Sequence, residues 1–307
     1  MAEPSTQDAA VPEPVEFLVI GECVADVVRT PGRPDRPHPG GSPANVAYGL
    51  ARLGRQAVLL TQLGQDAMGD LIRTHLASAG VAVLTDGQDV GTPSAVVTLG
   101  EHGRAEYEFA ITWSLGPVAA PRARHVHLGS LASVLEPGAG TARRLLRDLR
   151  GTGATVSYDP NIRPALFGER AAGTAAVEEC VALSHLVKAS DEDLGWLYPG
   201  VPVRDSAARW LGLGPRAVIV TCGGDGAFAL TADGEFRAEA DPAEIVDTVG
   251  AGDSFMSAVL AVLAGREPDP AAVGAALETA VAAAAITVSR AGAHPPTAGE
   301  LADRLRY

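Results

Sequence analysis

Four consecutive residues near the end of the chain, Gly250-Ala251-Gly252-Asp253, carry groups that could perform a phosphoryl transfer. An apolar run with helical period begins at Phe255, so the pattern predicts a glycine turn that opens onto a helix. The first backbone N–H groups of a helix have no intrahelical partner and lie at the positive end of its dipole, so such a turn can bind phosphate. A carboxylate beside it can accept a proton from an attacking hydroxyl. In isolation, Asp253 or Ser254 could equally well only cap the helix.

A second group of candidate residues lies in the first half of the chain. Gly40 and Gly41 allow the backbone to approach a ligand closely, and the amide of Asn45 can both donate to and accept from a polyol. We expect a helix over residues 45–53, so Asn45 could instead be its cap. Asp26 follows a buried strand expected at residues 16–20 and would lie where ligands bind in α/β folds, although it could also be a solvated turn residue.

The two groups together match a known family. The string D-T-V-G-A-G-D-S-F, residues 247–255, resembles the C-terminal signature of the PfkB-type carbohydrate kinases, the ribokinase-like family, at every position that this family fixes. The family also has a double glycine followed by an asparagine and a helix, which Gly40, Gly41 and Asn45 supply. Two motifs in the right order argue against coincidence. The resemblance, which extends over residues 17–296, implies ATP-dependent phosphorylation of a sugar hydroxyl, with Asp253 as the catalytic base and Gly250, Ala251 and Gly252 as the anion hole.

The same resemblance implies a sugar site built from several segments. The string D-P-N-I-R, residues 159–163, and the string Y-E-F, residues 107–109, are similar to those of fructokinase-like members. A loop-stabilising ion pair is an equal alternative for the D-P-N-I-R segment, and Arg163 could also help to position phosphate. The residues to which the resemblance assigns sugar binding are Asp26, Gly40, Gly41, Asn45, Tyr107, Phe109, Asn161 and Arg163.

The second half of the chain contains candidate residues for a nucleotide site and for metal sites. The string T-C-G-G-D-G, residues 221–226, resembles the T-x-G-x-x-G nucleotide turn of the family. Where many members carry N-x-x-E, this chain has Ser190-Asp191-Glu192-Asp193, so either Glu192 or Asp193 could hold Mg²⁺ through water. The backbone near Asp247 and Val249 falls where members bind a monovalent cation, which implies K⁺. The implied nucleotide-binding residues are Lys188, Thr221, Gly223, Gly226 and Val281.

Alternating strands and helices must hold these residues. The alternation predicts a mostly parallel sheet with helices on both faces. The resemblance implies an α/β fold, a ribokinase-like three-layer αβα sandwich over residues 15–307, with a small β-sheet lid formed near residues 27–40 and 92–112. Residues 1–14 are interpreted as a disordered tail, and the proline-rich residues 29–39 cannot form a regular helix. We further expect strands at 57–60, 125–128, 155–158, 185–187 and 217–221, hairpins at 92–111 and 227–238, and helices at 71–79, 141–149 and 271–288.

Composition excludes several classes of function. The formal net charge of −13 argues against non-specific binding to nucleic acid or anionic membranes. Residues 271–288 are rich in weakly hydrophobic alanine and include Glu278, so we expect a buried helix there and no membrane span. Three cysteines without a C-x-x-C pair indicate a reduced, cytoplasmic compartment. The seven histidines show no metal-ligand spacing, and His125 and His127 are expected to be structural. P-loop and G-x-S-x-G motifs are absent from the sequence.

The resemblance favours fructose as the substrate, but 2-keto-3-deoxygluconate, ribose and nucleosides stay open because they use the same scaffold. A non-catalytic sugar or nucleotide sensor is disfavoured because Asp253 and its glycine turn are intact. Family members often form homodimers through the lid. The proline-rich first lid segment, however, offers no long apolar strand that would require a partner.

Overall fold

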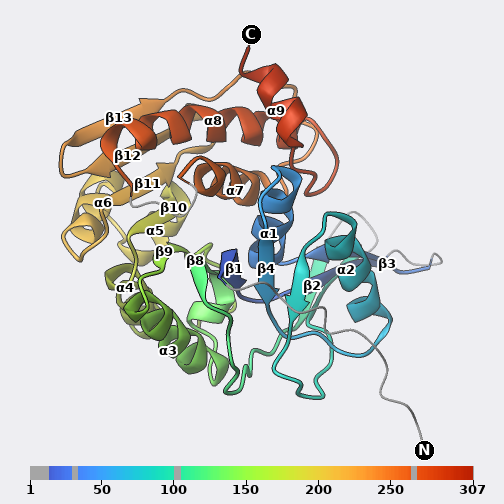
Figure 1. Cartoon of the computed structure of the whole chain (residues 1–307). Coiled ribbons are helices and arrows are strands. Elements are labelled where there is room, and N and C mark those ends of the chain that lie inside the picture. The colour runs from blue at the N-terminus through green and yellow to red at the C-terminus, as the bar shows by residue number, and fades with distance from the viewer. Residues whose placement is uncertain (1–13, 30–33, 100–104, 264–267, 307) are drawn as a thin grey trace, which may run out of the picture.

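The computed structural model describes residues 14–29, 34–99, 105–263 and 268–306 (Figure 1). Almost all of the expected disordered tail, residues 1–14, lies outside the described residues. Within the described part, a large sheet runs through the middle of the molecule and a smaller sheet lies at one side, near the N-terminal helices.

The large sheet has nine strands in the order β13-β12-β11-β10-β9-β8-β1-β4-β5. Neighbouring strands are parallel except in the β11-β12-β13 edge, where they are antiparallel. Strands β1, β4 and β9 are almost wholly buried, as expected for a parallel sheet covered on both faces. The bounds are β1 Val15–Ile20, β4 Ala57–Leu60, β5 Ala82–Leu84, β8 Ala123–Gly129, β9 Thr155–Asp159, β10 Leu186–Ser190, β11 Ala217–Thr221, β12 Ala227–Thr231 and β13 Gly234–Ala238.

Helices cover both faces of this sheet and give two separate apolar layers (Figure 1). One layer holds α1 (Ser42–Arg52), α2 (Ala67–Ser78), α7 (Ala251–Leu263) and α8 (Pro270–Val288). The other holds α3 (Gly138–Gly151), α4 (Arg170–Ala182), α5 (Asp191–Leu197) and α6 (Val203–Leu211). The short helix α9 (Ala298–Arg304) ends the described chain. This arrangement confirms the predicted three-layer αβα sandwich.

Helix α8 is long and apolar enough to cross a membrane by length and composition alone. In the structure it packs against α7, β12 and β13. Val273, Leu277 and Ala280 are fully buried in this contact. The prediction of a buried helix is therefore confirmed.

The small sheet has four strands in the order β3-β2-β6-β7, namely β3 Arg36–Gly40, β2 Val24–Arg29, β6 Ser94–Leu99 and β7 Ala105–Ala110. Strands β6 and β7 are antiparallel, which confirms the predicted hairpin. Strand β3 contains the last two prolines of the proline-rich segment, and it lies at an edge of the sheet, where proline is tolerated because no ladder partner needs its missing N–H. Both predicted lid segments thus join one sheet.

Strand β1 is the point where the order of the large sheet reverses, because β4 lies on one side of it and β8 on the other. Ligands of open α/β sheets bind outside the carboxyl ends of the strands at such a point. The N-termini of α1 and α7 reach this region, since side chains from both meet there. Helix α1 begins at Ser42 with Gly41 as its N-cap, three residues before the predicted start, so the alternative that Asn45 caps the helix is wrong.

Candidate active site

The carboxylate of Asp253 lies buried at the junction of three elements. Ser42 Oγ donates to Asp253 Oδ1 at 2.7 Å, and Asn45 Nδ2 donates to Asp253 Oδ2 at 2.8 Å. Both donors come from the first turn of α1. Asn161 Nδ2, from the loop after β9, lies 3.5 Å from Asp253 Oδ1. Three side chains therefore fix the orientation of the carboxylate, which is how a catalytic base must be held.

The turn before Asp253 has the geometry of an anion site. Gly250 has φ +75°, a conformation that favours glycine, and a Cβ added there would lie 2.5 Å from Ala293 Cβ. The N–H of Ala251 donates to Thr248 O at 3.2 Å. In the described part of the chain the amides of Gly252 and Asp253 donate to no backbone carbonyl. These two N–H groups are thus the ones available to an anion.

Lys188 brings a positive charge to the same point. Its Nζ donates to Asp159 Oδ2 at 3.0 Å, and both side chains are almost completely buried. A Cβ on Gly252 would lie only 3.2 Å from Lys188 Nζ, so the ammonium sits against the start of α7. Burial alone would lower the pKa of Lys188, but the carboxylates of Asp159, Asp193 and Asp253 raise it above its ordinary value. Lys188 therefore stays charged beside the turn at the start of α7.

The loop after β9 is held by two carboxylates. Asp159 Oδ1 accepts from the N–H of Asn161 at 3.2 Å, and Asn161 has φ +38°, which is uncommon for a residue with a side chain. Asp193 Oδ1 accepts from the N–H of Ile162 at 2.8 Å, and its Oδ2 accepts from the N–H of Ser190 at 2.9 Å. Asp193 thus closes the capping box of α5 and ties that helix to the loop.

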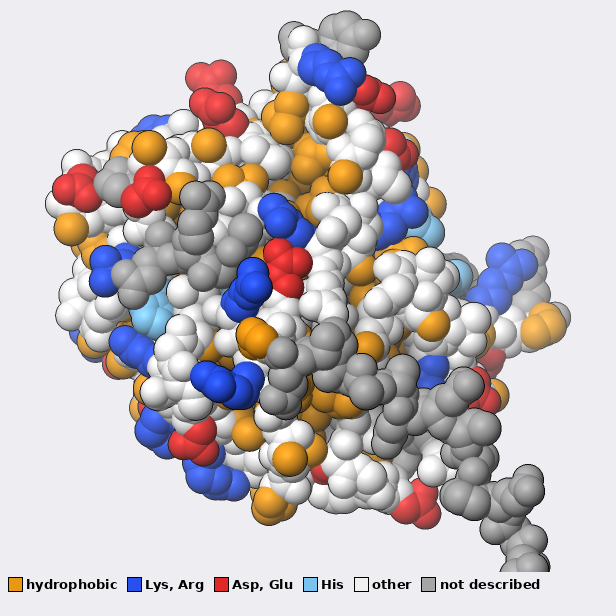
Figure 2. Space-filling model, in the orientation of Figure 1, with side chains coloured by type: hydrophobic (Ala, Val, Ile, Leu, Met, Phe, Trp, Pro, Cys, Tyr) orange, Lys and Arg blue, Asp and Glu red, His pale blue; other side chains and the backbone are white. Residues whose placement is uncertain are grey.

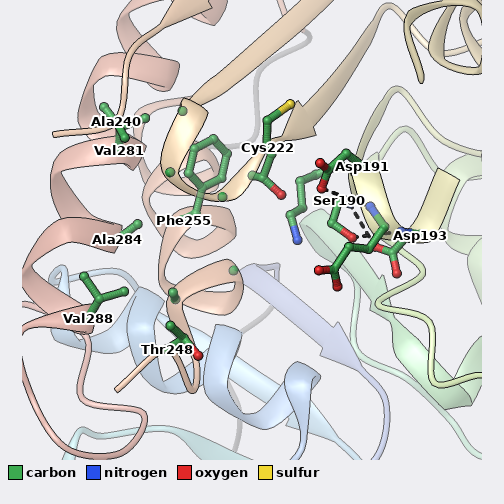
Figure 3. Close-up of a pocket in the computed structure, with 18 of the residues that line it drawn as sticks. Ser190, Asp191, Asp193, Cys222, Ala240, Thr248, Phe255, Val281, Ala284 and Val288 are labelled. Carbon is green, nitrogen blue, oxygen red and sulfur yellow. Dashed lines mark hydrogen bonds between the residues drawn. The ribbon is translucent and has the colours of Figure 1, made fainter. Parts of the chain in front are cut away.

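A cleft of about 940 Å³ runs from this loop along α7 to α8. Its two ends differ in chemistry (Figure 3). Ser190, Asp191 and Asp193 lie at one end, whereas the other end is formed by apolar side chains of α7, α8 and the segment before α7. The labelled apolar residues are Ala240, Phe255, Val281, Ala284 and Val288. A cleft that is polar beside a helix N-terminus and apolar at its far end suits a nucleotide.

The predicted nucleotide residues all line this cleft. Thr221 ends β11, Gly223 begins the short 3₁₀ turn Gly223–Asp225, and Gly226 follows this turn just before β12. Val281 faces the cleft from α8, and Lys188 faces it from β10. The structure therefore brings together five residues that were assigned to one site from separate motifs.

The predicted sugar residues lie around the strand ends on the lid side. Gly40 and Asp26 are in contact, because a Cβ on Gly40 would overlap the Asp26 carboxylate. Asp26 is exposed on β2, but its partial desolvation by neighbouring atoms raises its pKa, while the nearby charges of Arg163 and His38 oppose this shift. Asp26, on strand β2 of the small sheet, and Arg163, in the loop after β9 of the large sheet, therefore lie near each other. Phe109 is 44% exposed on β7, and the side chain of Tyr107 lies outside the described part of the structure.

The carboxylates in the two predicted cation regions differ in whether they already accept hydrogen bonds from the backbone. In the described ranges, no three His, Cys, Asp or Glu side chains form a group that could hold a metal directly. Glu192 is exposed in the cleft, whereas both oxygens of Asp193 accept backbone N–H groups. Asp247 accepts from the N–H groups of Val249 at 3.0 Å and Gly292 at 2.8 Å. These two bonds lower the pKa of Asp247 and join the turn before α7 to the loop after α8.

His125 and His127 are structural, as predicted. Thr155 Oγ1 donates to Arg124 O, so it must accept from His125 Nδ1 at 2.7 Å. His125 Nε2 then accepts from Ser157 Oγ at 2.7 Å, and Ser157 Oγ accepts from His127 Nδ1 at 2.9 Å. This chain of bonds places a proton on Nδ1 of both imidazoles, and it makes His125 neutral because the Nε2 of that residue accepts. Burial lowers the pKa of each histidine to about 3, which agrees with that assignment.

Two residues of the site were not assigned from the sequence. Ser42 lies inside the double-glycine motif, and Asp159 opens the D-P-N-I-R string, but neither had a predicted role. Their positions inside these motifs could have marked both residues as candidates for the site. The motifs do not show which residues they contact, because Asp253 and Lys188 lie far away in the sequence.

The distribution of charged side chains on the surface agrees with the negative net charge of the sequence. Figure 2 shows one face of the molecule, on which the basic side chains lie among acidic and uncharged ones and do not merge into one continuous basic surface.

Comparisons with known proteins agree with this geometry. Residues 16–298 match the model of the pfkB family carbohydrate kinases. A probable fructokinase-4 of Arabidopsis thaliana is 32% identical over 287 residues, which cover 87% of each chain. A fructokinase from Vibrio cholerae O395, solved with fructose, ADP and calcium ion bound, has a TM-score of 0.83 and 25% identity, covering 94% of this chain and 98% of that one. The aminoimidazole riboside kinase of Salmonella enterica, with aminoimidazole riboside and an ATP analogue, has a TM-score of 0.81 and 27% identity, covering 94% and 99%. The chain therefore belongs to the pfkB family of carbohydrate kinases and is a fructokinase-like member of it.

Proposed function

We propose that this enzyme transfers the γ-phosphate of ATP to a hydroxyl of fructose, with Asp253 as the catalytic base. One observation carries the proposal: the Asp253 carboxylate is fixed by Ser42 and Asn45 at the N-terminus of α7, beside the Lys188 ammonium. A base, two free amides and a buried cation thus converge on one point. These are the groups that an in-line phosphoryl transfer needs.

As an ATP-dependent sugar kinase, the chain must hold a hydroxyl and a phosphate in line. Asp253 would accept the proton of the attacking hydroxyl. The N–H groups of Gly252 and Asp253 would stabilise the charge on the transferred oxygens, with Ala251 shaping the turn through its bond to Thr248. The cleft polarity supports phosphates at the Lys188 end and the nucleoside at the Val281 end.

A Mg²⁺ ion bound to the ATP phosphates would neutralise their charge. Glu192 is the carboxylate that we favour for holding water of such an ion, because it is exposed in the cleft. Asp193 would act mainly through the loop that it anchors. For K⁺, the backbone near Asp247 and Val249 stays our candidate, since hydrogen bonds already order this turn.

Fructose is favoured as the substrate by the fructokinase names of relatives at about 30% identity. Asp26, Asn45, Asn161 and Arg163 would contact its hydroxyls, with Gly40 and Gly41 shaping the wall and Tyr107 and Phe109 covering it from the lid. A riboside is the second candidate, because one similar structure is a riboside kinase. The lid would exclude water and so limit hydrolysis of ATP.

An ADP-release assay with Mg·ATP tests the proposal against fructose, ribose, 2-keto-3-deoxygluconate, adenosine and aminoimidazole riboside. We expect strong turnover of fructose and a loss of at least about 10³-fold in kcat for Asp253→Asn, with ATP binding retained. Asp233→Asn, in the exposed β12–β13 turn, is the matched control. Turnover of a different sugar would replace fructose as the substrate. An Asp253→Asn variant with the wild-type rate would refute the catalytic assignment and favour a sensor.

We also propose a cytoplasmic location and a homodimer formed through the lid. All three cysteines, Cys23, Cys180 and Cys222, are free thiols, which suits a reducing compartment. The lid strands expose Val28 and Phe109. Sedimentation of wild type and of Phe109→Ser would test the dimer, which should dissociate more readily in the variant if the lid is the interface.

A further inference from the structure

We propose that Asp159 is a positioning residue that holds the Lys188 ammonium and the Asn161 amide in one fixed arrangement. The inference rests on the proposed roles of Asp253 and of the α7 N-terminus. Its basis is that the two oxygens of one buried carboxylate go to different parts of the site. Asp159 would thereby join the half that binds phosphate to the half that binds the sugar hydroxyl.

The first connection runs through Lys188. Asp159 is fully buried, and its Oδ2 lies 3.0 Å from Lys188 Nζ. The ammonium in turn sits against Gly252, at the turn whose free amides face the cleft. A lysine side chain has four rotatable bonds and no fixed donor geometry, so an ion-pair partner must set its position. Within the described residues, Asp159 is the one carboxylate that forms an ion pair with Lys188.

The second connection runs through Asn161. Asp159 Oδ1 accepts the N–H of Asn161, whose φ of +38° is sparsely populated for residues other than glycine. That conformation directs Asn161 Nδ2 toward Asp253 Oδ1, 3.5 Å away. The backbone strain is a cost that persists only where neighbouring bonds enforce it. Here the Asp159 carboxylate supplies such a bond.

The ion pair with Lys188 needs an ionised carboxylate, and in that form both oxygens of Asp159 accept only, as the two connections require. Burial raises the pKa of Asp159 to about 6, with the charge of Lys188 opposing the rise, so the group is ionised at neutral pH. The other titratable groups facing Lys188 are the carboxylates of Asp193 and Asp253 and the neutral imidazole of His127.

The test is a double-mutant cycle of Asp159→Asn with Lys188→Met, assayed by ADP release with the sugar found in the panel above. Asparagine has the same shape but cannot hold the ammonium by charge. We expect Asp159→Asn alone to lower kcat/KM for ATP by about 100-fold or more, because a displacement near 1 Å at a reacting centre has that effect. In the Lys188→Met background the same change should cost at most about tenfold, since one of its two connections is already gone. Equal losses in both backgrounds would overturn the proposal.

Stability measurements separate positioning from simple support of the fold. Asp159→Asn leaves a buried charge unpaired, so its melting temperature should fall, whereas the double variant should recover stability but not activity. Asp86→Asn is the matched control, because Asp86 also binds backbone N–H groups, of Gln88 and Gly116, in a loop outside the cleft. It should lower the melting temperature and leave kcat unchanged.

Two further readouts extend the test, and the first of them does not depend on the folding of Asp159→Asn. Asn161→Gly keeps the positive φ but removes the amide, so it should lower kcat more than it raises KM for ATP. In Asp159→Asn, the alkaline limb of kcat/KM should move to lower pH, because Lys188 loses its nearest carboxylate. An unmoved limb with an inactive Asp253→Asn variant would overturn this inference alone. If Asp253→Asn is active as well, the proposed function itself fails.

Discussion

Substitution of Gly250 by alanine should disable the anion site with little loss of fold. The added Cβ would lie 2.5 Å from Ala293 Cβ, whereas carbon atoms in contact lie about 3.5–4.0 Å apart. The turn or the loop holding Ala293 must therefore move by roughly 1.0–1.5 Å. A shift of that size takes the amides of Gly252 and Asp253 out of hydrogen-bond range of a phosphate oxygen. Loss of one such donor typically lowers kcat by about 10²–10³-fold.

Gly80→Ala is the matched control for this experiment. Gly80 has φ +84°, similar to the +75° of Gly250, but an added Cβ would meet nothing within 4 Å. Both variants carry the left-handed strain, about 1–2 kcal/mol, so both should lower the free energy of unfolding by at least that amount. Only Gly250→Ala should lose activity in the ADP-release assay. A Gly250→Ala enzyme with kcat within threefold of wild type, on the order of measurement scatter, would refute the anion-hole assignment.

Three other predictions follow from the site and its surroundings. His125 and His127 should stay neutral with the proton on Nδ1 from pH 8 down to pH 5, because their pKa values in the folded state are about 3; ¹⁵N NMR of the imidazoles checks this, and a resonance that titrates near pH 6.5 would contradict it. Since the unfolded chain protonates these histidines near pH 6.5, acidification below that value should cost about 1.4 kcal/mol of stability per pH unit for each of them. With GTP or CTP in place of ATP, kcat/KM should fall by no more than about 200-fold, because an apolar pocket such as that around Val281 and Ala284 rejects a wrong ligand weakly. A preference for ATP above about 10⁴-fold would contradict this and would mean that a polar group forms hydrogen bonds with the base. Gly252→Ala should raise KM for ATP more than it lowers kcat, because its Cβ would lie 3.2 Å from Lys188 Nζ and would displace that side chain. Steady-state kinetics, with Gly54→Ala as control, measures the two constants separately. An unchanged KM would contradict the contact between Gly252 and Lys188.

The sequence predicted the strands and the sandwich well, but it placed several helix starts too late. Helices expected at residues 45, 71 and 141 begin at Ser42, Ala67 and Gly138. The apolar run from Phe255 likewise belongs to a helix that starts at Ala251. In these first turns most residues are small or polar, and such residues carry no hydrophobic period although they favour helix starts. This matters for function, because the first turns of α1 and α7 hold the site.

The short elements β5, α5, α6 and α9 were not predicted, because three to nine residues give too little periodicity to recognise. The longer helix α4 was also missed, because alanine and glycine fill much of it and leave few strongly apolar positions. In the structure Asn45 donates to Asp253, and Lys188 lies in the cleft against Gly252, so residues from separate family motifs come together, while their roles stay predictions. The bond between Ser42 and Asp253 could not be predicted, because it joins residues 211 positions apart in the sequence. Such pairs depend on how α1 and α7 pack across the end of the sheet, and neither local propensity nor motif spacing encodes that packing.

The two prolines of β3 determine which edge of the lid sheet could pair with a further strand. Pro37 and Pro39 alternate along the edge strand, where a residue's N–H would otherwise point away from β2 toward solvent. Without those donors, the outer rim of β3 cannot template an additional strand from another chain. Strand β7 forms the opposite edge and contains no proline. Among the described strands, β7 is therefore the edge across which two copies of this enzyme could share a continuous lid sheet. The outer rim of β3 is protected from pairing of the kind that builds fibrils.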